Sequence, residues 1–175
     1  MKNEKPNLII IEHFISEPTE LFKELLRSVE WDETMKARKT ASFGVSYDYS
    51  GISYPKSEMH PLLKPVCKSI EKELGFYPNN SLLNYYENGD SSMGYHSDSS
   101  EELKEGTGVA IVSLGAERNI SYRSKKNKEI KYKYLLKNGA LLFMSNEIQV
   151  NWMHAIKKEK GVGERVSLTF RHIIK

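Results

Sequence analysis

The residues with the clearest potential for chemistry lie in MGYHSDSS, residues 93–100, where His96 and Asp98 stand two positions apart. Imidazole nitrogens and carboxylate oxygens are common metal ligands, so this spacing indicates a candidate metal site. A solvated polar turn can contain the same pair by chance. The interpretation therefore depends on what accompanies it elsewhere in the chain.

A third potential ligand is His154, within the strand-like run NWMHAI at 151–156. With His96 and Asp98 it forms a possible two-histidine, one-carboxylate set, which suits non-haem Fe(II). Three ligands on one face of an octahedral ion leave three positions open, which a bidentate organic acid and O₂ can share. A lone histidine in a strand is more often a packed interior residue, so the set is a hypothesis at this stage.

The run RVSLTFR at 165–171 adds two arginines that share one face of a strand. Side chains alternate across a strand, so Arg165, Ser167 and Arg171 lie opposite the apolar side chains. If the apolar face packs on helices, both guanidinium groups point inward. They then need an anionic partner, because an unpaired buried charge costs several kcal/mol.

The run SLLNYY at 81–86 supplies polar groups by the same alternation. Asn84 and Tyr86 fall on one face, opposite Leu83 and Tyr85, and can hydrogen-bond to a bound anion. A dicarboxylate such as 2-oxoglutarate could chelate iron at one end and pair with a guanidinium at the other.

The length and composition limit the kinds of protein that this chain can be. With 175 residues we expect one domain, residues 1–175, and a monomer. The single cysteine and the charged start MKNEKPN predict a reduced, intracellular setting, cytoplasmic or nuclear. No apolar run approaches the roughly 20 residues of a membrane span, so we expect no membrane partner.

Two helices and an irregular loop are expected in the N-terminal part, after a short strand at 7–14. Ser16 could cap a helix with Pro18 in its first turn, and apolar residues recur at helical spacing up to Val29. A second helix fits 61–74, with Gly75 as its stop.

Short alternating runs separated by turn pairs follow from residue 81, and they predict about seven consecutive antiparallel strands. The expected fold is mostly β, of the α+β class. It is a sandwich or jelly roll (double-stranded β-helix) with the N-terminal helices packed on one outer face.

The motif HSD…H is preceded by NYY, encloses GVAIVSLGAER and is followed by RVSLTFR, and with this order and spacing the chain resembles the AlkB-type Fe(II)/2-oxoglutarate dioxygenases from about residue 36 to the C-terminus. The resemblance implies that His96, Asp98 and His154 bind iron. It implies that 2-oxoglutarate is held by Asn84, Tyr86, Arg165 and Arg171, with Arg165 at the far carboxylate. Ser167 stands where the family usually has Asn. Its side chain is shorter, so its hydroxyl reaches less far toward the co-substrate.

The activity implied is oxidative demethylation of N-alkylated bases in DNA or RNA, such as 1-methyladenine and 3-methylcytosine, with consumption of O₂ and 2-oxoglutarate. An alternative is an AlkB-like hydroxylase or demethylase of a protein or small molecule. A non-enzymatic, cupin-like binding module is a third reading. Arg165 and Arg171 argue against a non-enzymatic binding module, because a simple metal binder does not need two arginines to bind a dicarboxylate.

Residues 38–51, RKTASFGVSYDYSG, resemble the lid that such demethylases fold over a flipped base, and we expect a lid at 36–54. Tyr49 is the candidate for stacking on the base, with Tyr47 behind it. Packing at a sheet edge is the alternative for these aromatic residues.

The net charge of +3 is too small to indicate a nucleic-acid partner, so the clustering of basic residues matters more. Lys125 and Lys126 in the run 123–133, with Arg38 and Lys39, are candidate phosphate contacts, although such runs are also ordinary solvated surface. Ser100 stands where the AlkB-type family usually has Asp or Glu in contact with the base.

Overall fold

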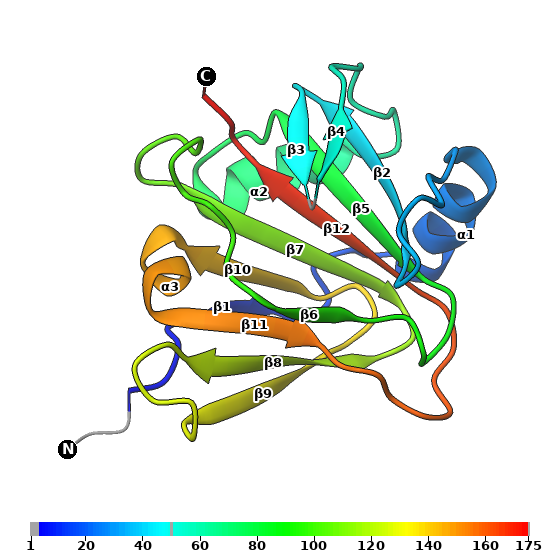
Figure 1. Cartoon of the computed structure of the whole chain (residues 1–175). Helices are drawn as coiled ribbons and strands as arrows, with labels where there is room; N and C mark the ends of the chain where they lie inside the picture. Colours follow the sequence, from blue (N-terminus) through cyan, green and yellow to red (C-terminus); the bar gives the residue numbers. More distant parts are fainter. Residues whose placement is uncertain (1–3, 50, 175) are drawn as a thin grey trace.

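The computed structural model describes residues 4–49 and 51–174, which form the strands and helices labelled in Figure 1. In chain order the elements are β1 Ile9–Ile11, α1 Pro18–Ser28, β2 Lys39–Gly44, β3 Tyr47–Tyr49, β4 Ile52–Tyr54, α2 Lys64–Leu74, β5 Asn80–Tyr86, β6 Met93–His96, β7 Gly108–Gly115, β8 Arg118–Ser124, β9 Lys131–Leu136, β10 Leu141–Ser145, α3 Asn146–Asn151, β11 Trp152–Ile156 and β12 Arg165–Arg171.

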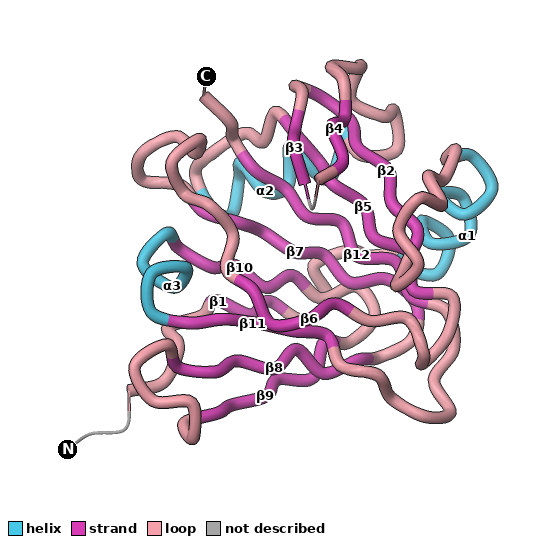
Figure 2. Tube along the Cα trace, in the orientation of Figure 1, coloured by secondary structure: helices cyan, strands magenta, loops and turns pink. Residues whose placement is uncertain are grey.

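Two antiparallel sheets make up the body of the protein (Figure 2). The major sheet has the order β1-β10-β7-β12-β5-β2, and the minor sheet has the order β6-β11-β8-β9. This confirms the mostly β, jelly-roll prediction. Among the described strands, only β3–β4 and β8–β9 pair with the next in sequence. From β5 to β12 the chain crosses repeatedly between the two sheets.

The helices α1 and α2 cover the outer face of the major sheet, as predicted. Leu25 of α1 and Ile70 of α2 belong to one buried apolar cluster with Val166, Leu168 and Phe170 of β12. Burial of this face leaves the alternate side chains of β12 directed between the two sheets. The strand parity inferred for the arginines is therefore confirmed.

The helix boundaries differ slightly from those expected. Helix α1 begins at Pro18 with Glu17 as its N-cap residue, and Ser16 makes no capping hydrogen bond. Helix α2 begins at Lys64 rather than residue 61, because residues 61–63 form a turn first. Its end at Gly75 is as predicted, and the φ of +81° there is one that glycine adopts without strain. None of the described helices is long and apolar enough to span a membrane.

The segment expected to be irregular contains three strands. Strand β2 pairs with β5 along its whole length, so the first part of the expected lid at 36–54 is fixed in the major sheet. Only the β3–β4 hairpin stands apart as a two-stranded sheet, drawn in cyan at the top of Figure 1. The sequence also gave no indication of α3, since Ile148 and Val150 alternate at strand spacing.

Candidate active site

The minor sheet brings the two candidate histidines together. Strands β6 and β11 are antiparallel neighbours in which His96 and His154 are direct partners, and their ring centroids lie 4.3 Å apart. Asp98 follows two residues after the end of β6. The potential ligand atoms of these three residues all lie within 4.8 Å of one another, so the predicted set converges on a single point.

The two imidazoles present their Nε2 atoms to this point. Nδ1 of His96 lies 2.8 Å from the Gly94 carbonyl oxygen, which accepts its hydrogen bond and fixes the tautomer. Nε2 of His96 lies 3.7 Å from Oδ1 of Asp98, and Nε2 of His154 lies 3.8 Å from Oδ2. Burial lowers the pKa of His154 to about 4, so this ring is neutral at pH 7 and has a lone pair to donate.

The Asp98 carboxylate is 6% exposed and remains ionised. Burial alone would raise its pKa, but the charge of the neighbouring Arg171 outweighs burial and lowers the pKa below its usual value. An ionised carboxylate between two imidazoles is a ligand set for one divalent ion.

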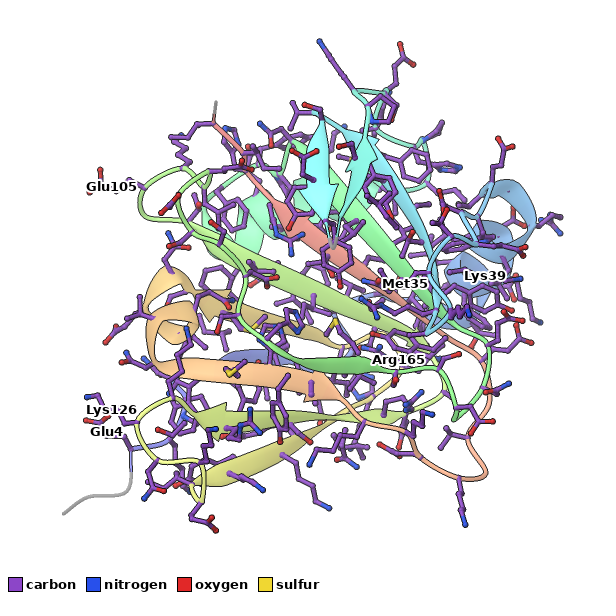
Figure 3. The ribbon with its side chains drawn as sticks, viewed as in Figure 1. Glu4, Met35, Lys39, Glu105, Lys126 and Arg165 are labelled. Atoms are coloured by element: carbon purple, nitrogen blue, oxygen red, sulfur yellow. The ribbon has the colours of Figure 1, made fainter. Side chains whose placement is uncertain are left out.

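Two buried guanidinium groups extend the site inward from this point. Arg165 is 1% exposed and Arg171 is 2% exposed. Among the described residues, Nε and Nη1 of both side chains have no hydrogen-bond partner. Figure 3 places Arg165 between the two sheets. Buried donors without partners are costly, so these two side chains fit a bound anion such as a dicarboxylate.

An inner pocket joins the two arginines to the three candidate ligands. Its polar wall includes Asn84, Tyr86 and Ser167, as the strand alternation predicted, and aliphatic side chains from both sheets complete it. Arg165 Nη2 donates to the Ser113 hydroxyl at 2.8 Å, and its Cζ lies 5.0 Å from the Tyr86 ring centroid. Ser113 was not anticipated, although its place within an apolar strand sequence was a possible indication.

A second, outer pocket of about 610 Å³ shares His96 and Asp98 with the inner pocket. The rings of Tyr47 and Tyr49, from β3, line it and are stacked with centroids 6.2 Å apart. The guanidinium of Arg171 lies 4.8 Å from the Tyr47 ring centroid. His96 and Asp98 therefore line both pockets, whereas His154 lines the inner pocket.

Arg38 is buried beneath the hairpin and makes three hydrogen bonds. Its Nε donates to Oδ1 of Asn84 at 2.9 Å, Nη1 donates to the Ser92 carbonyl at 2.9 Å, and Nη2 donates to the Tyr49 hydroxyl. These internal hydrogen bonds occupy the Arg38 side chain, which the sequence had predicted to contact phosphate. Arg38 connects the co-substrate side of the site, at Asn84, with the hairpin.

The remaining substrate candidates are dispersed. The Lys39 ammonium lies 2.9 Å from Glu33 and 3.4 Å from Glu87, which argues against a phosphate role. Lys125 donates to the Gln149 carbonyl at 2.7 Å. Lys126 is exposed at the β8–β9 turn, far from Lys39 (Figure 3).

Ser100 is not part of the outer-pocket lining, whereas its neighbour Ser99 is. The lining also includes Met35, Met93 and Tyr95, which were not anticipated. Nothing in the types of these residues marks them in the sequence, because their role depends on the position of β6 and the hairpin.

Comparison with known proteins agrees with this geometry. Residues 8–171 match the family model described as "2OG-Fe(II) oxygenase superfamily". The chain is 32% identical over 179 residues to "Alpha-ketoglutarate-dependent dioxygenase alkB homolog 3" of Bos taurus, covering 91% of this chain and 63% of that protein. It is 29% identical over 182 residues to "DNA oxidative demethylase ALKBH2" of Homo sapiens, covering 91% and 70%.

The solved structure of OsALKBH1 has the same fold, with a TM-score of 0.67 at 14% identity over 97% of this chain and 99% of that chain. The chain spans about 63% of the length of the bovine alkB homolog 3 that it matches.

Proposed function

Because the chain belongs to the 2OG-Fe(II) oxygenase superfamily, and within it to the AlkB type, we propose that it removes N-alkyl groups from nucleobases of DNA or RNA by oxidation. The observation that carries this proposal is the convergence of His96, Asp98 and His154 in the inner pocket, with His96 and Asp98 also lining the outer pocket. The inner pocket is cationic and the outer pocket is aromatic. Their chemistry suits a dicarboxylate and a flat base.

Fe(II) is the family's metal, and His96, Asp98 and His154 are its proposed ligands. 2-Oxoglutarate is proposed to lie in the inner pocket, with Arg165 and Tyr86 at its far carboxylate and Arg171 beside the metal. Asn84 and Ser167 complete its hydrogen bonds. When bound, the iron and 2-oxoglutarate supply the oxidising power from O₂, releasing succinate and CO₂ as an oxygen atom enters a substrate C–H bond.

The protein's own contribution is to bind and orient. The Arg165 guanidinium is held by Ser113 and by the Tyr86 ring, so its free donors point in a fixed direction. Asn84 accepts a hydrogen bond from Arg38 through its oxygen, which leaves its NH₂ group as a donor for the inner pocket. Preorganised donors of this kind bind an anion without a large ordering cost.

The outer pocket supports a nucleobase as the substrate. Tyr47 and Tyr49 present nearly parallel rings with an interplanar angle of 19°. Stacking of a base on an aromatic ring contributes about 1–3 kcal/mol and does not depend on sequence. A base must leave the helical stack to reach such a pocket, and methylated bases, which pair poorly, do so at lower cost.

The test is incubation of the protein with Fe(II), ascorbate and 2-oxoglutarate against methylated DNA and RNA oligonucleotides, with demethylation read by mass. We expect loss of the methyl group from 1-methyladenine or 3-methylcytosine, with one succinate formed per methyl group removed. Succinate formation without demethylation of any oligonucleotide would support a protein or small-molecule substrate instead.

A further inference from the structure

The metal-ligand loop that carries Asp98 is held in place by α3 and the start of β11. Strand β6 ends at His96, so sheet hydrogen bonds no longer fix the backbone at Asp98. Two other contacts replace them. The backbone N–H of Asp98 donates to Oε1 of Gln149 at 2.9 Å, and the Ser97 hydroxyl donates to the Trp152 carbonyl at 2.8 Å.

Gln149 is well placed to fix this loop because its own side chain is immobilised. It is 3% exposed, and its Nε2 lies 3.6 Å from Sδ of Met144 in the apolar core. The amide group is therefore held at its nitrogen by the core and at its oxygen by Asp98. The orientation of the Gln149 amide therefore sets the course of the backbone from β6 to Asp98, and with it the position of the Asp98 carboxylate.

We propose that Gln149 is a positioning residue for the metal site, acting through the backbone of Asp98. The side-chain oxygen Oε1 of Gln149 keeps the Asp98 carboxylate between His96 and His154. There, Nε2 of each histidine lies within 4 Å of a carboxylate oxygen. Gln149 touches neither the metal nor a substrate. The proposal rests on the metal site proposed above.

Lys125 extends the same arrangement to the β8–β9 turn. Its ammonium donates to the main-chain carbonyl of Gln149 at 2.7 Å, and its backbone N–H donates to the Asn151 carbonyl at 3.0 Å. Lys125, which the sequence predicted to contact phosphate, therefore connects the β8–β9 turn to α3. Lys125 is a secondary support of Gln149 in this proposal.

The experiment is a titration of the metal-free protein with Co(II), followed by visible absorption, which reports ligand geometry without catalysis. Gln149→Met keeps the side-chain length and removes the oxygen, and we expect a 10- to 100-fold loss of Co(II) affinity, the range found for residues that orient metal ligands. Affinity within about twofold of wild type for Gln149→Met would overturn the proposal.

Gln149→Asn provides a second test if the methionine variant does not fold. It keeps the amide but withdraws the oxygen by one methylene group, so the same loss of affinity is expected. Circular dichroism and thermal unfolding check that each variant has the native fold. A folded Gln149→Asn variant with wild-type affinity would also overturn the proposal.

A double-mutant cycle separates positioning from general packing. If Gln149 acts through Asp98, Gln149→Met should cause no further loss in an Asp98→Ala background. An equal loss in both backgrounds would show that Gln149 acts by another route. If Asp98→Ala itself binds Co(II) like wild type, the proposed metal site is wrong, which is a different outcome from failure of Gln149 alone.

Lys125→Met and Lys128→Met form a matched pair from the same turn, because both are exposed lysines but only Lys125 has a contact with α3 among the described residues. We expect Lys125→Met to lower Co(II) affinity, by less than Gln149→Met, and Lys128→Met to leave it unchanged. Equal affinities of the two variants would overturn the role of Lys125.

Discussion

Nη2 of Arg171 lies 3.3 Å from Oδ1 of Asp98, so the cationic end of the inner pocket is in direct contact with the candidate metal ligands. Both side chains are almost completely buried, and Arg171 is the first of the charges that keep Asp98 ionised. A metal bound by Asp98 and a co-substrate bound by Arg171 would therefore depend on one shared ion pair.

This contact predicts a combined defect in Arg171→Met. Loss of the guanidinium removes a co-substrate contact and leaves the Asp98 carboxylate buried without its partner. We expect 2-oxoglutarate binding, measured by calorimetry, to weaken by about 2 kcal/mol or more. The metal-free variant should also lose more thermal stability than the Co(II)-loaded variant, because the ion compensates the charge. An unchanged affinity for 2-oxoglutarate would place Arg171 outside the co-substrate site.

The two histidines should differ in their effect on stability. His96 is partly exposed and His154 is 2% exposed, so His96→Ala leaves a smaller cavity. Both substitutions should abolish tight Co(II) binding. We expect His96→Ala to cost about 1 kcal/mol in the free energy of unfolding, and His154→Ala to cost more. Tight Co(II) binding by either variant would contradict the ligand assignment.

Tyr49 should affect binding of the nucleic acid more than binding of the co-substrate. Tyr49→Ala removes a stacking surface worth about 1–3 kcal/mol, so KM for a methylated oligonucleotide should rise about 5- to 150-fold. The dissociation constant of 2-oxoglutarate should change less than this KM, although Tyr49 also lines the inner pocket. Tyr49→Phe is the control, since it keeps the ring and loses only the hydroxyl that accepts from Arg38. A normal KM in Tyr49→Ala would exclude Tyr49 from base stacking.

Salt dependence should separate Lys126 from Lys39. Each phosphate contact adds about one unit to the slope of log affinity against log salt concentration. Lys126→Met should therefore reduce this slope for oligonucleotide binding by about one unit. Lys39→Met should leave the slope unchanged, because Glu33 and Glu87 already neutralise Lys39. Identical slopes for the wild type and Lys126→Met would remove this residue from the phosphate-binding surface.

Cys67 should be inert in the folded protein. Its side chain is buried, and burial raises the pKa of its thiol to about 11. At pH 8 the reactive thiolate is therefore rare as well as inaccessible. Because the folded pKa exceeds that of an exposed thiol, this group should destabilise the fold as pH rises from about 9 to 11. Labelling with a thiol reagent at pH 8 should be as slow as unfolding, and rapid native labelling would contradict this.

The sequence by itself determined the features that depend on local periodicity and residue type. Alternation in β12 separated Arg165 and Arg171 from Val166, Leu168 and Phe170, because a strand has only two faces and one of them was apolar. The end of α2 at Gly75 could also be predicted from the sequence. In both cases the physical rule acts over a few residues, so no distant partner is needed to apply it.

Elements whose local pattern was ambiguous were missed. The run NEIQVN forms α3, although its alternating apolar residues favour a strand. Strand β2 lies where the sequence predicts an irregular loop. Their conformation is decided by what they pack on: α3 buries Ile148 and Gln149, and β2 pairs with β5. Tertiary packing overrides local preference in such short segments.

Only the tertiary structure decided which polar groups meet. The direct pairing of His96 with His154, the neutralisation of Lys39 by Glu33 and Glu87, and the hydrogen bond from Asp98 to Gln149 all join residues from different elements. The sequence supplied these groups but not their distances. Hydrogen bonds and ion pairs act over a few ångströms, so their partners are fixed only when the two sheets and α3 have packed together.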